Sequence, residues 1–313
     1  MDKLAKDNRL CKAIIGLNWN EIMVMLPSFS KYLLEDKSIT RKQKEKELGR
    51  KLQNNGGRPD FLDTDLKKLV FALFYLKAYP TFDVFGWLVG FHRSNAHRQT
   101  VYLLKILENT LGRNLVLPDR KITSPEELMK KFPDLKDVFV DATEREVQRP
   151  KDSKKQRKLY SKKKKLHTRK NVIVSGSGHT KDPREILVIT KTKSGRRHDK
   201  KLSDKEQLFQ KLPKDIGKFV DTGFQGVQEQ TDNIQKPKKK PPKSKNNPDP
   251  KLTEEEKENN TVIGSFRVLA EHAICGVKRF NCLNQAYRNK IVNLDDQFIL
   301  ICSGLWNWHL RNS

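Results

Sequence analysis

The chain has little cysteine and no long apolar segment. The sequence of 313 residues contains no Cys-x-x-Cys pair, and its four cysteines, each among apolar neighbours, are Cys11, Cys275, Cys282 and Cys302. We expect reduced thiols in a core, which argues against a disulfide framework or a structural zinc site. Since no apolar run of about 18 residues and no secretory leader pattern are present, a membrane-spanning or secreted protein is disfavoured and a cytoplasmic one is expected.

Acidic residues are scarce relative to basic ones. The chain has 64 Lys and Arg against 38 Asp and Glu, which gives a formal net charge of +26. Such an excess is larger than solubility requires and favours a polyanionic partner. Because the basic residues are spread through segments with folded patterns, nucleic acid is a better candidate than a membrane surface.

The first 60 residues predict a small helical cap followed by an exposed basic arm. Residues 10–34 have apolar side chains at helical spacing, and we expect that helix to break at Pro27. The arm closes on Gly56-Gly57-Arg58-Pro59. A Gly-Arg-Pro core can lie in a DNA minor groove, but an ordinary turn explains the tripeptide equally simply.

Residues 61–120 predict three helices arranged as a helix-turn-helix domain. An apolar helix with an aspartate cap stops before Pro80, a short helix follows, and Gly90 separates it from a third helix. In a helix-turn-helix the second helix of the motif offers its first residues to base edges. An ordinary three-helix bundle stays open as the alternative. The candidate DNA contacts are Arg93, Ser94, Asn95, His97, Arg98 and Gln99.

From residue 135 onward the pattern changes to short apolar runs. They are rich in Val and Ile and continuous rather than alternating, which is typical of strands covered on both faces of an α/β sheet; they lie at 138–143, 171–176, 185–192 and 218–223. Helices are expected at 201–212, after residue 252, and at 294–310. Between 236 and 252, prolines and like charges predict a mobile basic loop.

Two of these apolar runs lead directly into an aspartate. Asp141 follows Phe-Val in one run and Asp221 follows Phe-Val in another. At the carboxyl ends of neighbouring strands, about 4.8 Å apart, two such carboxylates repel unless a cation lies between them. A hard divalent ion such as Mg²⁺ fits oxygen ligands of this kind. Capping of the following turn is the alternative role for each aspartate.

A third acid lies on a predicted helix over residues 267–280. At about 100° per residue, Arg267, Glu271 and Lys278 fall on one stripe, while apolar residues fall on the opposite side. The helix therefore packs one side and presents an acid and two basic groups on the other. A simple i,i+4 pair between Arg267 and Glu271 is the alternative explanation.

At these residues the chain resembles DDE transposases of the insertion-sequence-five group. Arg267, Glu271 and Lys278 match the signature Tyr-x2-Arg-x3-Glu-x6-Lys, although Gly264 stands at the tyrosine position. Residues 79–98 resemble the family's helix-turn-helix, and the resemblance covers nearly the whole chain. Further matching segments lie at 140–150, 160–168, 195–202 and 220–226.

The resemblance implies a ribonuclease-H-like α/β fold, with a mixed sheet flanked by helices, over residues 135–313, after the all-α helix-turn-helix domain. It implies that Asp141, Asp221 and Glu271 form a catalytic triad that holds two Mg²⁺ or Mn²⁺ ions. The partners implied are double-stranded DNA, as transposon ends and target, and further copies of the chain in a homodimer or higher oligomer. A prokaryotic, nucleoid-associated location follows from the same comparison.

Other residues receive supporting roles from the resemblance. His198 and Asp199 either cap a helix or bond to the metal ligands, and Gly223 and Gly226 let DNA approach the backbone. The implied phosphate contacts are Lys162, Lys163, Lys164, Lys165, Arg267, Lys278 and Arg279, with solvated surface charge as the alternative for the lysine run. A domesticated endonuclease without strand transfer, or a DNA-binding regulator with a vestigial acidic site, remain competing functions.

Overall fold

The computed structural model describes residues 1–53, 61–242 and 249–313, and its contacts divide the chain into two units. Unit 1 comprises residues 1–117, 279–285 and 297–313, and unit 2 comprises 118–278 and 286–296. This division groups the C-terminal helix with the N-terminal helices rather than with the strands. The Gly-Arg-Pro tripeptide at 57–59 lies outside the described residues.

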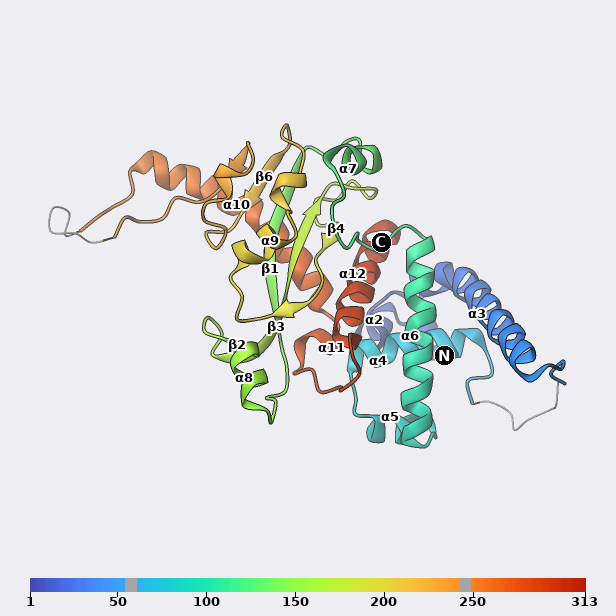
Figure 1. Ribbon diagram of the computed structural model, residues 1–313. Helices are drawn as coiled ribbons and strands as arrows, with labels where there is room; N and C mark the ends of the chain where they lie inside the picture. Colours follow the sequence, from blue (N-terminus) through green and yellow to red (C-terminus); the bar gives the residue numbers. More distant parts are fainter. Residues whose placement is uncertain (54–60, 243–248) are drawn as a thin grey trace. The chain divides into compact units, whose positions relative to one another are not determined.

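Unit 1 is built from helices (Figure 1). The three predicted at 61–120 are present as α4, α5 and α6, but Thr64 rather than an aspartate caps α4, because its side chain accepts a bond from the Lys67 amide. The elements are α1 (Asp2–Lys6), α2 (Asn8–Ile15), α3 (Trp19–Leu48), α4 (Asp65–Ala78), α5 (Phe82–Val89), α6 (Arg93–Arg113), α11 (Asn281–Asn284) and α12 (Leu294–Asn312), whose residues from Gln297 on belong to this unit.

The expected break at Pro27 is wrong, because α3 continues through it to Leu48. Buried residues on both sides of the proline, among them Ile22, Met25 and Phe29, form one continuous apolar face that holds the helix together. Pro27 itself is exposed. Packing of this face offsets the loss of one backbone hydrogen bond.

Two glycines shape the turn between α5 and α6. Gly90 ends α5 with a φ of 68°, a left-handed conformation that favours glycine, so the predicted turn is confirmed. At Gly86 an added Cβ would lie 2.6 Å from the Phe91 carbonyl oxygen. The backbone of α5 therefore approaches the turn too closely for any larger residue.

Unit 2 contains a mixed sheet, which confirms the predicted fold class (Figure 1). The central strand β1 (Asp137–Glu146) is antiparallel to β3 and parallel to β6, and β6 is parallel to β7. The other strands are β2 (Tyr160–Ser161), β3 (Leu166–Gly176), β4 (Ile186–Ile189), β5 (Lys193–Ser194), β6 (Gly217–Val220) and β7 (Ile234–Gln235). The spatial order is β2-β3-β1-β6-β7, with β4 and β5 pairing with β3.

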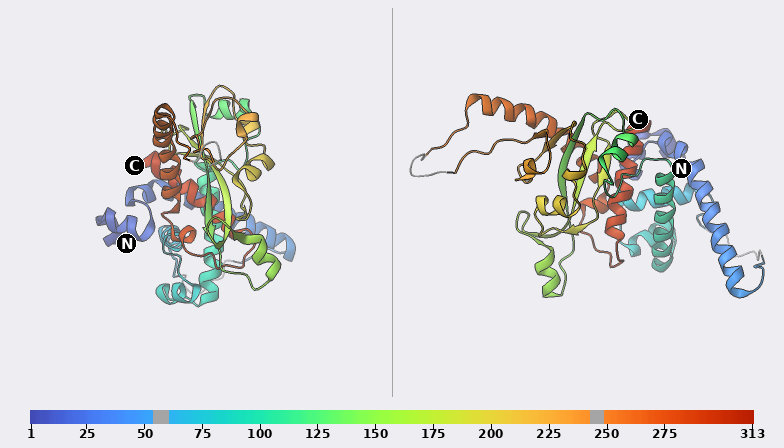
Figure 2. Two further views of the ribbon diagram at one scale, coloured as in Figure 1. Left: turned by 90° about the vertical axis from the view of Figure 1, so that its left-hand side faces the viewer. Right: turned by 45° about the horizontal axis from the view of Figure 1, so that its top comes forward.

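Helices cover both faces of this sheet, as the continuous apolar runs predicted (Figure 2). On one face α10 (Glu254–Lys278) packs Ile263 and Ala270 onto Phe139 and Phe219. On the other face lie α7 (Pro125–Lys131) and α9 (Asp199–Lys205), which cover a cluster that includes Val140. Alternate residues of β1 and β6 thus face α10, and the residues between them face α9.

The remaining elements depart in part from the sequence prediction. The helix expected at 201–212 is interrupted: α9 ends at Lys205, Gln207 has a φ of 52°, and a 3-10 turn covers Phe209–Lys211. A short helix that was not predicted, α8 (Ser153–Leu159), precedes β2. No helix in the described ranges combines the length and apolar character needed to cross a membrane.

Replacing Pro27 tests whether α3 runs through this position as a continuous helix. We expect Pro27→Ala to raise the free energy of unfolding by up to about 3 kcal/mol, because alanine restores a backbone donor and removes the clash with the preceding turn. Urea denaturation followed by circular dichroism measures the change. Lys31→Ala, also exposed on α3, is the control and should leave stability nearly unchanged. A less stable Pro27→Ala variant would contradict an uninterrupted helix.

Candidate active site

Asp141 and Asp221 both follow the last residue pair of the β1–β6 register. This parallel pairing ends where Val140 lies opposite Val220, and each aspartate is the next residue along the chain. Asp221 directly follows the end of β6, as predicted. Asp141 is not at a strand end, because β1 runs on to Glu146 and pairs Asp141 with Ile173 of β3. The β6 side of Asp141 is nevertheless left open by the end of the parallel ladder.

Each of the two carboxylates bonds to the amide that follows it. Asp141 Oδ1 accepts a bond from the Ala142 N–H at 2.7 Å, and Asp221 Oδ1 accepts one from the Thr222 N–H at 2.7 Å. The Phe224 N–H also donates to the Asp221 carbonyl, closing a turn. The turn-forming role considered for Asp221 is therefore present beside its position in the acidic pair.

Asp141 is short of positive charge. Its pKa is raised to about 6: burial is the largest cause, and the negative charges of Asp221 and Asp199 also raise it, against lowering by the Ala142 N–H and Arg267. No ion pair among the described residues includes Asp141. A cation at this position would therefore stabilise the ionised form of the carboxyl.

Arg267 connects the third acid to this pair. Its Nη2 lies 3.3 Å from Asp221 Oδ1 and 3.5 Å from Glu271 Oε1. The i,i+4 pair with Glu271 exists, but the same guanidinium also crosses from α10 to the turn after β6. This reach is possible because Phe139 and Phe219, two residues before the aspartates, already face α10. The Glu271 side chain is 55% exposed.

The three acids fit a divalent ion only in part. No group of three His, Cys, Asp or Glu side chains in the described part of the chain is gathered closely enough to hold an ion. The Asp141–Asp221 pair supplies oxygen ligands and an unbalanced negative charge, which suit a hard ion that keeps several waters. Glu271 reaches the pair only through Arg267. Two acids thus fit directly, and the third lies one side chain away.

Two basic residues of the predicted DNA-contact set have partners elsewhere. Lys278 Nζ donates to the Glu144 carbonyl at 3.0 Å and so connects the end of α10 to β1. Burial lowers the pKa of Lys278, and the positive charges of Lys164 and Arg145 lower it further. Arg279 belongs to unit 1, where its guanidinium lies over the rings of Phe280 and Trp306 with Nε and Nη2 buried. The structure thus places Arg279 against two aromatic rings, and the phosphate contact stays a prediction.

A buried ion-pair network that the sequence analysis missed lies on the α9 face. Lys170 is 5% exposed, and its Nζ lies 3.0 Å from Glu144 Oε1 and 2.7 Å from Asp199 Oδ1. Burial lowers the pKa of Lys170, but the bonds to Asp199 and Glu144 outweigh it and raise the pKa overall. Glu144 and Lys170 are opposite each other in the β1–β3 register. The sequence shows an acid near one apolar run and a lysine near another. The strand register is needed to show that these two residues face each other.

Asp199 does not cap α9, contrary to one of the two roles predicted for it. His198 is the N-cap residue and makes no side-chain capping bond, while Asp199 is the first residue of the helix. Its Oδ2 would lie 3.0 Å from a Cβ added to Gly223. The missing side chain at Gly223 thus leaves room for the Asp199 carboxylate. Gly226 has a φ of 76°, a backbone conformation that residues other than glycine rarely adopt.

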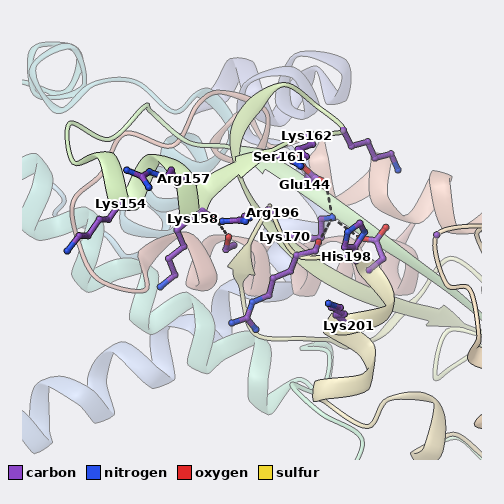
Figure 3. Close-up of a pocket in the computed structure, with 16 residues that line it drawn as sticks. Glu144, Lys154, Arg157, Lys158, Ser161, Lys162, Lys170, Arg196, His198 and Lys201 are labelled. Carbon is purple, nitrogen blue, oxygen red and sulfur yellow. Dashed lines mark hydrogen bonds and ion pairs between the residues drawn. The ribbon is translucent and has the colours of Figure 1, made fainter.

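A basic pocket of about 890 Å³ opens beside this network (Figure 3). It shares Gly223 with the Asp221 turn and includes His198. Glu144 and Asp199, its two acids, are both paired with Lys170. Lys162 and Lys163 of the predicted lysine run line it, whereas Lys164 and Lys165 do not. Its cationic residues are Lys154, Arg157, Lys158, Lys162, Lys163, Lys170, Arg196, Arg197 and Lys201.

The predicted base-contacting residues lie in the first turns of α6. Arg93, Ser94, Asn95 and Arg98 are exposed, and Gln99 is partly buried. His97 differs from them, because its ring packs edge-on against Phe82 at 4.9 Å. Arg98 and Gln99 also line a pocket of about 390 Å³ together with Lys37, Lys68 and Tyr102.

The mixed sheet with paired carboxylates at its centre is typical of ribonuclease-H-like nucleases. The chain belongs to the DDE superfamily endonuclease family, whose model matches residues 140–307. It is also 31% identical over 264 residues to a protein of Microchaete diplosiphon described as a probable transposase for insertion sequence element IS702. That similarity covers 83% of this chain and 86% of the relative. No solved structure matches the chain significantly.

The raised pKa of Asp141 predicts a pH-dependent stability of the metal-free chain. A carboxyl whose pKa rises from 3.8 to about 6 on folding favours the folded state at low pH, and this contribution is lost as pH rises through about 6. Asp141→Asn should therefore gain stability relative to wild type between pH 4 and 7, by at most roughly 3 kcal/mol. Urea denaturation in EDTA across that range measures it.

Asp182→Asn provides a control of opposite sign. Hydrogen bonds from Arg184 lower the pKa of Asp182, so its stabilising contribution is present above the unfolded pKa and is lost as pH falls. This variant should lose stability relative to wild type at neutral pH. Loss of stability by both variants at pH 7 would contradict the unbalanced charge at Asp141.

Proposed function

We propose that the chain is a transposase that binds the terminal inverted repeats of a transposon, hydrolyses the phosphodiester at the ends and joins the freed 3′-hydroxyl to target DNA. One observation carries the proposal: Asp141 and Asp221 each directly follow the last residue pair of the β1–β6 register, and Arg267 links Asp221 to Glu271. The family match and the description of the relative as a probable transposase support the same activity.

Asp141, Asp221 and Glu271 would hold two Mg²⁺ or Mn²⁺ ions. Such ions, when bound, activate a water or hydroxyl for attack and stabilise the leaving oxygen. The chain's own part is to place three carboxylates on two strands and one helix and to keep Asp141 partly shielded from water. Arg267, which neutralises Asp221 and Glu271 here, is placed to donate to a phosphate oxygen once metal ions balance the acids.

The remaining basic residues would bind DNA in two ways. The basic pocket presents Lys and Arg side chains beside the Asp221 turn, which suits phosphate contacts without base choice. The exposed start of α6 carries Asn95, Arg98 and Ser94, side-chain types that read base edges in a major groove. Joining two transposon ends would require at least two copies of the chain, each with one such site.

Acid substitutions test the catalytic assignment. With terminal-repeat DNA and Mg²⁺, Asp141→Asn, Asp221→Asn and Glu271→Gln should each abolish nicking and joining while keeping DNA affinity, because they remove metal ligands but no cationic group that binds phosphate. Gel assays of cut and joined products and filter binding measure the two properties. Glu254→Gln, on the exposed start of α10, is the matched control. Full cutting by any triad variant would remove that acid from the site.

Salt dependence separates binding to phosphates from binding to bases. Lys162→Ala with Lys163→Ala should weaken binding of all DNA sequences alike and lower the salt slope by roughly two, because each lysine neutralises one phosphate. Arg98→Ala should weaken only terminal-repeat DNA, by about 1–3 kcal/mol. Titrations at several salt concentrations measure both effects. Equal weakening on repeat and random DNA for Arg98→Ala would contradict base reading by α6.

A further inference from the structure

We propose that Lys170 and Asp199 are positioning residues, which hold the turn that carries Asp221 in the geometry that receives a divalent ion. This inference rests on the proposed metal-dependent function. It concerns side chains on the face of the sheet opposite Arg267, where the resemblance assigns no role to Lys170.

The ammonium of Lys170 is fully engaged. Besides the carboxylates of Glu144 and Asp199, its Nζ donates to the Arg197 carbonyl at 3.0 Å. An ammonium has three donors, so these three partners satisfy it. Glu144 is itself bonded by the Thr168 hydroxyl at 2.7 Å. Lys170 therefore joins β1, β3 and the start of α9 at one buried point.

The start of α9 in turn packs against the Asp221 turn. Asp199 Oδ2 stands 3.0 Å from the Cβ position at Gly223, and Lys200 Cε stands 3.1 Å from that at Gly226. Both glycines of the turn thus lie against the first two residues of α9. A displacement of Asp199 would be transmitted to the turn without any intervening side chain.

A second buried lysine gives a comparison within the same unit. Lys218 is 0% exposed, and its Nζ donates to the carbonyls of Lys214, Ile216 and Asp232. Among the described residues it bonds to these backbone groups and to no carboxylate. Lys170 instead fixes the carboxylate of Asp199, whose charge reaches Asp141. Lys218 therefore supports the backbone of its own region, whereas Lys170 also fixes a carboxylate near Asp141 and Asp221.

The test compares Lys170→Met with Lys218→Met in the full chain. The Mn²⁺ affinity, measured by electron paramagnetic resonance, should fall in Lys170→Met by up to about 10-fold, the lower end of the range for groups bonded directly to metal ligands, because Lys170 acts on the Asp221 turn through Asp199. Hydrogen exchange of the Thr222 and Phe224 amides should accelerate in the same variant. Lys218→Met should lower the melting temperature without either effect.

A charge-neutral pair of substitutions covers the case that Lys170→Met fails to fold. Glu144→Gln/Lys170→Met removes the buried carboxylate together with its partner, and should fold better while showing the same fall in Mn²⁺ affinity, because Asp199 is still released. Unchanged affinity and unchanged amide exchange in a folded form of either variant would overturn the inference. Absence of Mn²⁺ binding by wild-type protein would instead overturn the proposed function.

Discussion

Compensation of negative charge at the end of the β1–β6 pairing is the constraint on which the rest of unit 2 depends. The parallel pairing of β1 with β6 brings Asp141 and Asp221 near each other, and neither backbone position can move far from the other while Val140 stays opposite Val220. Glu271 and Asp221 share Arg267, and Glu144 and Asp199 share Lys170. Asp141 keeps the surplus, and burial together with its acidic neighbours raises its pKa.

The two faces of the sheet divide this task. On the α10 face, a single arginine spans from helix to turn and leaves Glu271 largely exposed. On the α9 face, Lys170 is enclosed and satisfied. A partly exposed ion pair exchanges partners at small energetic loss, whereas breaking a buried one is strongly unfavourable. The ion pairs of Arg267 on the α10 face are therefore suited to change partners, and the Lys170 network on the α9 face is suited to keep the Asp221 turn in place.

Much of this arrangement follows from local patterns in the sequence. Apolar runs predicted β1, β3, β4 and β6, and helical periodicity placed Arg267 and Glu271 on one stripe, because both properties depend on neighbouring residues. The path of α3 through Pro27 was not predictable, since it depends on packing against distant helices. Nor were the partners of Arg279 and Lys170, because rings and strand register from remote segments decide them. The position of Asp221 after its strand was foreseen, whereas the position of Asp141 within β1 and the contact of Arg267 with Asp221 were not.

The charge balance also bears on how many ions the acids accept. Three ionised carboxylates, Asp141, Asp221 and Glu271, with the one guanidinium of Arg267 leave two negative charges, which a single divalent ion neutralises. A second ion at the same place would create a surplus of positive charge in a chain whose formal net charge is already +26. In the proposed function, the phosphates of DNA would supply the missing negative charge. In that function, occupation by two ions would therefore depend on the presence of substrate, and Arg267 would be free to pair with a phosphate instead of its carboxylates.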